Sequence, residues 1–264
     1  MQTIFRNPLA GPYVLGISSG ASLGVAILVL GVASTGLASL SGLATSFSLA
    51  GAAFVGALAV LLIILAVSLR VKEIMTILIL GMMFGSAASA LVSVMQFFSH
   101  ETTLRAFVIW TMGSLSSVAG MQLWVFSFMV GLGLLLSLFS FRALNVLLLG
   151  ESYSKNIGLN VTLARIIIFS STSLLAGAVT AFCGPIGFIG IAVPHIARMV
   201  FKTANHAILI PGVIVIGSST LLLCDIISQL PGNDATLPIN SVAALLGIPI
   251  VIYIVMRNRR FAGI

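Results

Sequence analysis

Charged residues are scarce in this chain, and their scarcity excludes most protein classes. Asp, Glu, Lys and Arg make up only 6% of the 264 residues, whereas 59% are hydrophobic and the mean hydropathy is +1.24. A water-soluble fold cannot cover its surface with so few charges, and so apolar a composition also excludes a disordered chain. Because the apolar runs are long and unbroken, the sequence predicts an all-α, polytopic membrane protein.

Cysteine and catalytic motifs are equally sparse. The only cysteines, Cys183 and Cys224, lie in apolar stretches, where small buried hydrophobes are expected rather than a disulfide or a metal site. The sequence contains no GxxxxGK[ST] loop, no HExxH and no GxSxG. We therefore expect no enzyme activity, no catalytic residue, no metal and no cofactor in this chain.

The net charge of +7 comes from basic residues that are scattered singly between apolar runs, which favours a role in membrane topology and argues against nucleic-acid binding. About eight crossings are predicted, one of them short. They span residues 12–33, 46–69, 74–98, 122–141, 162–183, 186–199 (the short one), 207–228 and 238–256, with an interfacial segment near 106–118.

The positions of Lys and Arg decide whether the short run 186–199 crosses. If it does, Arg105 is the only one of the 12 basic residues outside, and the C-terminus is cytoplasmic. If it does not, Arg198 and Lys202 fall outside and the bias is lost. We therefore predict that it crosses, and the cytoplasmic set with this crossing comprises Arg6, Arg70, Lys72, Arg142, Lys155, Arg165, Arg198, Lys202, Arg257, Arg259 and Arg260.

Glycines recur every four residues in two of the predicted spans. Gly16, Gly20 and Gly24 share one helix face, and Gly81 and Gly85 have the same spacing. Small residues at this spacing allow a neighbouring helix to approach closely, so we expect these faces to be packing surfaces.

Residues 143–161 form the longest polar stretch on the predicted cytoplasmic side, which we call the elbow. Gly150 and Gly158 bracket its polar part, and apolar residues flank it. This pattern predicts two short helices broken at glycine and suited to docking a soluble partner, although a simple linker is the alternative.

Two further features stand out. The segment GPIGFIGIAVPHIAR combines Gly187, Gly190 and Pro194, which limit regular helix and allow close packing, with His195 and Arg198 at its cytoplasmic end.

Asp225 is the only acid inside a predicted span. A buried acid can mark an ion path, so an ion-coupled secondary transporter using Asp225 is the alternative function.

In three places the chain resembles a known family. The stretches FRNPLAGPYVLGISSGASLG, LLLGESYSKNIGL and GPIGFIGIAVPHIAR are similar, in order and spacing, to the FecCD-type (type II) permeases of ABC importers for iron-siderophores, haem and cobalamin. The resemblance implies one permease domain over residues 1–264 that contains the elbow. That family has ten helices, so the chain is expected to lack the first helix and most of the second.

The resemblance also implies partners and a location. They are a second permease subunit, two cytoplasmic ATPase subunits that carry ATP and Mg, an extracytoplasmic binding protein and the lipid of the bacterial plasma (inner) membrane. The expected function is import of an iron chelate or cobalamin.

Residue roles are expected from this resemblance and, for the path, from the small or flexible character of the side chains. We expect ATPase coupling at Gly150, Glu151, Ser152, Lys155 and Gly158, a cytoplasmic mouth at Asn7, Pro8, Leu9, Ile74 and Met75, a translocation path along Met82, Met83, Ser86 and Ser89, and binding-protein docking at Arg105 and Gln229. Gln229 stands where the family often carries Arg, so electrostatic steering of the binding protein is expected to be weak.

Overall fold

The computed structural model describes residues 1–32, 46–71, 73–116, 118–230 and 236–258, which form helices joined by turns and loops and contain no strand. This confirms the predicted all-α fold class. Three of the residues that were expected in the cytoplasm lie outside the described residues: Lys72, Arg259 and Arg260. The side chain of Arg257 is likewise not described.

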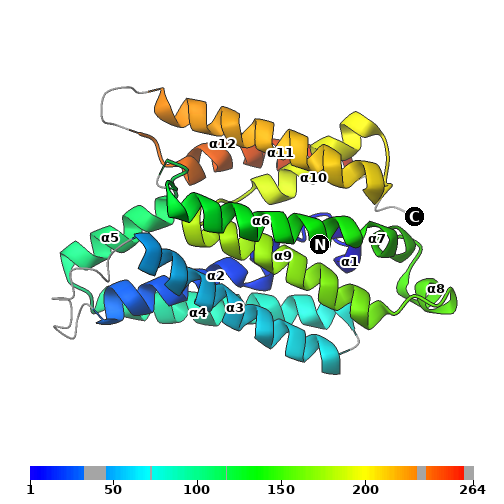
Figure 1. Cartoon of the computed structure of the whole chain (residues 1–264), viewed down its shortest axis with the longest axis horizontal. Helices are drawn as coiled ribbons and strands as arrows, with labels where there is room; N and C mark the ends of the chain where they lie inside the picture. Colours follow the sequence, from blue (N-terminus) through cyan, green and yellow to red (C-terminus); the bar gives the residue numbers. More distant parts are fainter. Residues whose placement is uncertain (33–45, 72, 117, 231–235, 259–264) are drawn as a thin grey trace. The chain divides into compact units, whose positions relative to one another are not determined.

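The chain forms two compact units, Met1–Pro185 and Ile186–Ile264. The first contains α1 (Gln2–Phe5), the 3-10 helix η1 (Pro12–Leu15), α2 (Ile17–Ala26), the π-helix η2 (Ile27–Val32), α3 (Ser46–Arg70), α4 (Ile74–Phe97), α5 (Glu101–Met112), α6 (Met121–Phe139), α7 (Phe141–Leu147), α8 (Glu151–Asn156) and α9 (Val161–Cys183). The second contains α10 (Ile189–Phe201), α11 (His206–Gln229) and α12 (Ile239–Asn258). Figure 1 labels the α-helices along the chain.

Among the described residues, 5 helices are long and apolar enough to cross a membrane. They are α3, α4, α6, α9 and α11, and they match five of the predicted spans to within a few residues. The other three predicted crossings correspond to shorter apolar helices at Ile17–Gly31, Ile189–Phe201 and Ile239–Tyr253.

The predicted crossing over 12–33 is not one regular helix. The chain forms η1 first and then turns at Gly16, whose φ of 74° is left-handed, before α2 begins. Such a φ favours glycine and interrupts a right-handed helix. The predicted interfacial segment is also shifted, since α5 starts at Glu101 and ends before Gly113, which has a φ of 74°.

The glycine faces of α2 and α4 pack as predicted. A Cβ atom added at Gly24 would lie 2.1 Å from the carbonyl oxygen of Ala52 in α3, and one added at Gly16 would lie 2.9 Å from the carbonyl oxygen of Gly81 in α4. These distances leave no room for a methyl group, so α2 touches both neighbours backbone to backbone.

Helix α9 is the central helix of the first unit and packs against both α3 and α6 (Figure 1). Two buried hydroxyls on α9 have partners on neighbouring helices: Ser171 Oγ donates to the Gly133 carbonyl at 2.9 Å, and Thr180 Oγ1 lies 3.4 Å from Ser18 Oγ. Within an apolar bundle, such bonds satisfy polar groups that would otherwise be costly to bury.

Helix α6 presents a large apolar face to the outside of the unit. Trp124, Phe128 and Phe139 are 76%, 72% and 79% exposed, and their spacing places them along one side of the helix. An aromatic face of this size is unfavourable in water and favourable against lipid chains, as expected for a membrane-spanning helix.

Candidate functional site

The elbow consists of two short helices, α7 and α8, as its sequence predicted. Gly150 precedes α8 with a φ of 110°, and Gly158 follows it with a φ of 90°. Both values are left-handed, so each turn favours glycine. Between them, Ser154 is fully buried, and its hydroxyl donates to the carbonyls of Gly150 (2.6 Å) and Val146 (3.0 Å).

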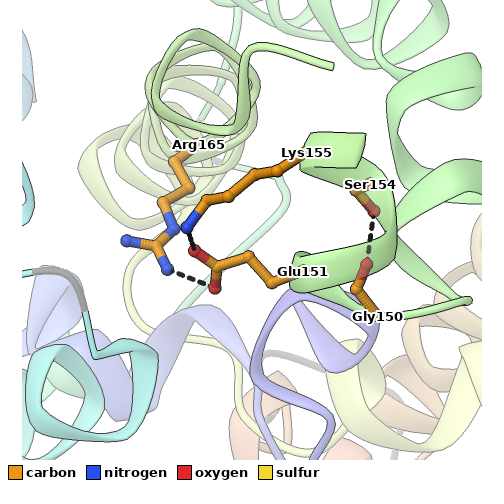
Figure 2. Close-up of polar contacts among 5 residues, drawn as sticks. All are labelled: Gly150, Glu151, Ser154, Lys155 and Arg165. Atoms are coloured by element: carbon orange, nitrogen blue, oxygen red, sulfur yellow. Dashed lines mark hydrogen bonds and ion pairs between the residues drawn. The ribbon is translucent and has the colours of Figure 1, made fainter. Parts of the chain in front are cut away.

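Glu151 is the electrostatic centre of the elbow. Its Oε1 lies 3.0 Å from Lys155 Nζ within α8, and its Oε2 lies 2.8 Å from Arg165 Nη2 on α9 (Figure 2). The side chain of Arg165 is 6% exposed and that of Glu151 is 34% exposed. The second ion pair therefore fastens α8 to the first turns of α9, one of the membrane-spanning helices.

Two opposing effects set the pKa of Glu151. Burial acts to raise the pKa, but the hydrogen bond from Lys155, the charges of Arg165 and Lys155, and the hydrogen bond from Arg165 together hold it below its usual value of 4.5. The carboxylate is thus ionised at neutral pH, and cations of its own chain already match its charge. The sequence offered no signal for the contact with Arg165, because the two residues lie on different helices.

The outer surface of the elbow is apolar. Leu148, Leu149, Tyr153 and Ile157 are 45%, 64%, 52% and 57% exposed, and Ser152 is also exposed. Exposed apolar residues next to polar ones are typical of a surface that binds another protein. This composition favours the docking interpretation of the elbow over the linker alternative.

A cavity of about 440 Å³ lies between α1 and the elbow. It is lined by Thr3, Ile4, Arg6, Ile74, Leu147, Leu149, Gly150, Glu151, Ser152, Tyr153, Val161 and Arg165. Of the five residues predicted to form the cytoplasmic mouth, only Ile74 lines it. Asn7, Pro8 and Leu9 form the turn after α1, where Asn7 Oδ1 accepts a hydrogen bond from the Leu9 amide at 2.9 Å, and Met75 is 47% exposed.

Three of the four residues predicted to line the path share one face of α4. Met82, Ser86 and Ser89 are exposed and follow helical spacing, and Ser89 Oγ lies 3.5 Å from Ser19 Oγ. Ser93 extends the same face and bonds back to the Ser89 carbonyl at 3.0 Å. Met83 is also exposed, but it projects roughly 100° around the helix from Met82 and does not join this face.

The two residues predicted to dock a binding protein lie in different units. Arg105 is exposed on α5, and Gln229 is the last residue of α11. The amide of Gln229 donates to Asp225 Oδ2 at 2.8 Å. The side chain at this position is thus a neutral partner of an acid rather than a cation.

In the second unit, the glycine- and proline-rich segment builds α10 and its entry. The Gly187 amide donates to Asn240 Oδ1 at 2.9 Å, which ties the entry of α10 to the start of α12. Pro194 lies inside α10, and His195 is buried. Arg198 lies in the last turn, and Gly190 is exposed near the first. Asn240 was not identified from the sequence, where a lone Asn in an apolar run carries no specific signal.

Comparison with known proteins places this arrangement in a family. The model of the FecCD transport family matches residues 1–257. The vitamin B12 import system permease protein BtuC of Escherichia coli O9:H4 (strain HS) is 35% identical over 261 residues, which are 98% of this chain and 77% of that protein. The BtuC protein of Salmonella arizonae is also 35% identical, over 98% of this chain and 76% of that protein.

A solved structure has the same fold. It is an inward-facing conformation of a protein described as a metal-chelate type ABC transporter, with a TM-score of 0.84 and 27% identity, covering 97% of this chain and 79% of that one. The chain therefore belongs to the FecCD transport family and is a multi-pass permease of the ABC importer type.

Proposed function

We propose that this permease imports a bulky metal chelate and that cobalamin is the first candidate. The observation that carries the proposal is the 35% identity to vitamin B12 permeases over 98% of the chain. The exposed face of α4, built from Met82, Ser86 and Ser89, supports it. Flexible thioether and small hydroxyl side chains contact a large, partly polar complex without holding it tightly.

The energy for import comes from a separate ATPase chain, because this sequence has no nucleotide-binding loop. We propose that the ATPase binds the part of the elbow's apolar surface that does not line the cavity, Leu148 and Ile157, near Gly150 and Gly158. The Glu151–Arg165 ion pair then carries the displacement of α8 to α9, which packs against α3 and α6. Such coupling requires the ATPase to bind the elbow differently in its two states.

The complete importer in this proposal contains a second permease subunit, two ATPase subunits with their ATP and Mg, and an extracytoplasmic binding protein. It lies in a bacterial plasma membrane with the elbow and the C-terminus in the cytoplasm. We expect the binding protein to dock near Arg105 and Gln229. With a neutral side chain at Gln229, charge steering contributes little to that encounter.

Ion-coupled transport through Asp225 is less well supported. Asp225 lies near one end of α11 and accepts a hydrogen bond from Gln229 at 2.8 Å, so a neighbouring side chain already engages it. Within the described ranges, no group of three or more His, Cys, Asp or Glu side chains could hold a metal ion. A coupled transporter needs ion ligands or linked acids at mid-depth.

Uptake measurements test the cargo. A strain lacking its own cobalamin permease is complemented with this gene and its neighbouring importer genes, and then supplied separately with radiolabelled cobalamin, a ferric siderophore and haem. Restored cobalamin uptake alone supports the proposal, whereas restored siderophore or haem uptake assigns an iron chelate instead. Uptake that persists without the ATPase gene and collapses with a proton uncoupler contradicts ATP-driven import.

A further inference from the structure

We infer that the cavity between α1 and the elbow is a binding site for the phosphate headgroup of an anionic phospholipid. The inference rests on the membrane placement of the chain and not on the cargo proposed above. Three features carry it: the depth of the cavity in the membrane, its charge and its mixed lining.

The cavity lies at headgroup depth. Ile74 and Val161, which line it, are the first residues of the membrane-spanning helices α4 and α9. A cavity at the ends of two spans lies at the depth of the interface between lipid headgroups and acyl chains. The Lys and Arg bias places this end in the cytoplasm, where the leaflet carries anionic lipids that attract basic residues.

The lining carries one cation that is not matched by an acid. Arg165 is paired with Glu151, which Lys155 also neutralises. Arg6 forms no ion pair with any residue that the structure describes, and its Nη2 atom would lie 2.5 Å from a Cβ added at Gly150. The guanidinium is therefore held over Gly150, which is possible because glycine has no side chain there. Guanidinium groups bind phosphate oxygens in a bidentate geometry, through two parallel N–H···O hydrogen bonds.

A second acid near this end does not alter the charge of the cavity. Glu73 precedes α4 but does not line the cavity, and it accepts a hydrogen bond from Thr76 Oγ1 at 2.9 Å. The lining itself contains Arg6 and Arg165 against Glu151 alone, which leaves a net positive charge. An anion is thus the ligand that this charge selects.

The remaining lining fits a lipid better than a free anion. Ile4, Leu147 and Leu149 provide apolar walls, and Tyr153 has the amphipathic character typical of the membrane interface. The volume of about 440 Å³ falls in the usual range of small-ligand sites. Polar and apolar walls in one cavity match a phosphate joined to the start of an acyl chain.

Lipid binding to the full chain tests the inference. The purified protein is titrated with phosphatidylglycerol and, separately, with phosphatidylcholine, and bound lipid is counted by native mass spectrometry. Phosphatidylglycerol should bind more tightly, and Arg6→Gln should weaken its binding about fivefold, in line with about one unit of interfacial charge attraction. Arg6→Lys should largely retain binding. The matched control Arg142→Gln removes another exposed cytoplasmic cation and should leave binding unchanged.

A second variant guards against misfolding of the first. Thr3→Glu places a carboxylate in the same lining, where it can pair with Arg6, and should lower phosphatidylglycerol binding without affecting phosphatidylcholine. Equal losses in Arg6→Gln and Arg142→Gln would overturn the inference, as would equal affinities for the two lipids. Full displacement of the lipid by inorganic phosphate at matched concentration would show that the cavity takes a free anion. If Arg6→Gln weakens ATPase binding in neutral lipid and leaves phosphatidylglycerol binding intact, the cation serves a protein contact.

Discussion

Arg165 Nη2 lies 2.8 Å from Glu151 Oε2, and this ion pair joins residues that are 14 positions apart in the sequence. It connects a short helix at the surface of the elbow to a helix that is long enough to cross the membrane. A force applied to α8 therefore has a direct polar route into α9, in addition to the covalent link through Gly158.

Reversing the pair tests that route. Glu151→Lys should allow membrane insertion but abolish uptake, because it places a cation beside the buried Arg165. The double variant Glu151→Arg with Arg165→Glu should recover part of the uptake. A double-mutant cycle on unfolding should give a coupling on the order of 1 kcal/mol, since solvent screens the one-third exposed Glu151. Normal ATPase stimulation and uptake in Glu151→Lys would contradict the route.

The pH dependence of this pair follows from the lowered pKa of Glu151. A carboxyl whose folded pKa is depressed contributes stability that is present above its unfolded pKa and lost as pH falls through the folded one. The stability difference between the wild type and Glu151→Gln should thus be fully present at neutral pH, decline as the pH falls below 4.5, and vanish only once the pH is below the lowered pKa of the folded state. Thermal unfolding in detergent across this range measures it, and a difference that grows on acidification would contradict the assignment.

The turn after α8 should depend on glycine for conformational reasons rather than for space. A Cβ added at Gly158 meets no atom within 4 Å, but the φ of 90° is strained for any other residue, at a cost on the order of 1 kcal/mol or more. Gly158→Val should therefore abolish uptake and ATPase stimulation while leaving insertion and chelate capture by the binding protein intact. Gly131→Val in α6, where a Cβ is equally unhindered, is the matched control and should transport normally.

Helix packing gives a prediction with an internal control. Gly24→Ala drives a methyl group to within 2.1 Å of the Ala52 carbonyl oxygen and should lower the free energy of unfolding by about 1–3 kcal/mol. Gly51→Ala changes the same residue type in α3 with no atom within 4 Å, so it should be neutral or slightly stabilising. Equal unfolding midpoints for the two variants would show that α2 and α3 are packed less closely at Gly24 than the distance to Ala52 indicates.

Topology is open to direct labelling. In a background with Cys183→Ser and Cys224→Ser, the exposed positions Asn156→Cys and Ala204→Cys should react with a membrane-impermeant thiol reagent only after the cytoplasm is opened. Thr102→Cys, close to Arg105, should react from outside in intact cells. Labelling of Ala204→Cys from outside would mean that α10 does not cross and that the charge argument fails.

The sequence predicted features that depend on local pattern and missed those that depend on long-range contacts. Apolar run length located α3, α4, α6, α9 and α11, and the paired glycines located the two elbow helices. Glycine spacing also identified the surfaces of α2 and α4. The break at Gly16 was missed because glycines in an apolar run fit both a packed helix and a turn.

The candidate site likewise combines features that the local sequence pattern predicts with contacts that it does not. Glu151 could be singled out as an acid in a glycine-bracketed polar stretch, but not its contact with Arg165, which depends on how α8 folds back against α9. Arg6 and Asn240 were likewise inconspicuous, because their roles come from elements brought together only in three dimensions.

The backbone contacts of α2 have a mechanical consequence. Where Gly24 meets α3 and Gly16 meets α4, the nearest atoms are backbone atoms of the neighbouring helix, so no side chain at these two contacts can switch rotamer to accommodate sliding. Helices packed in this way cannot slide gradually past one another, so α2, α3 and α4 should move together as a rigid body. A conformational change of the permease must then take place at hinges outside these three helices.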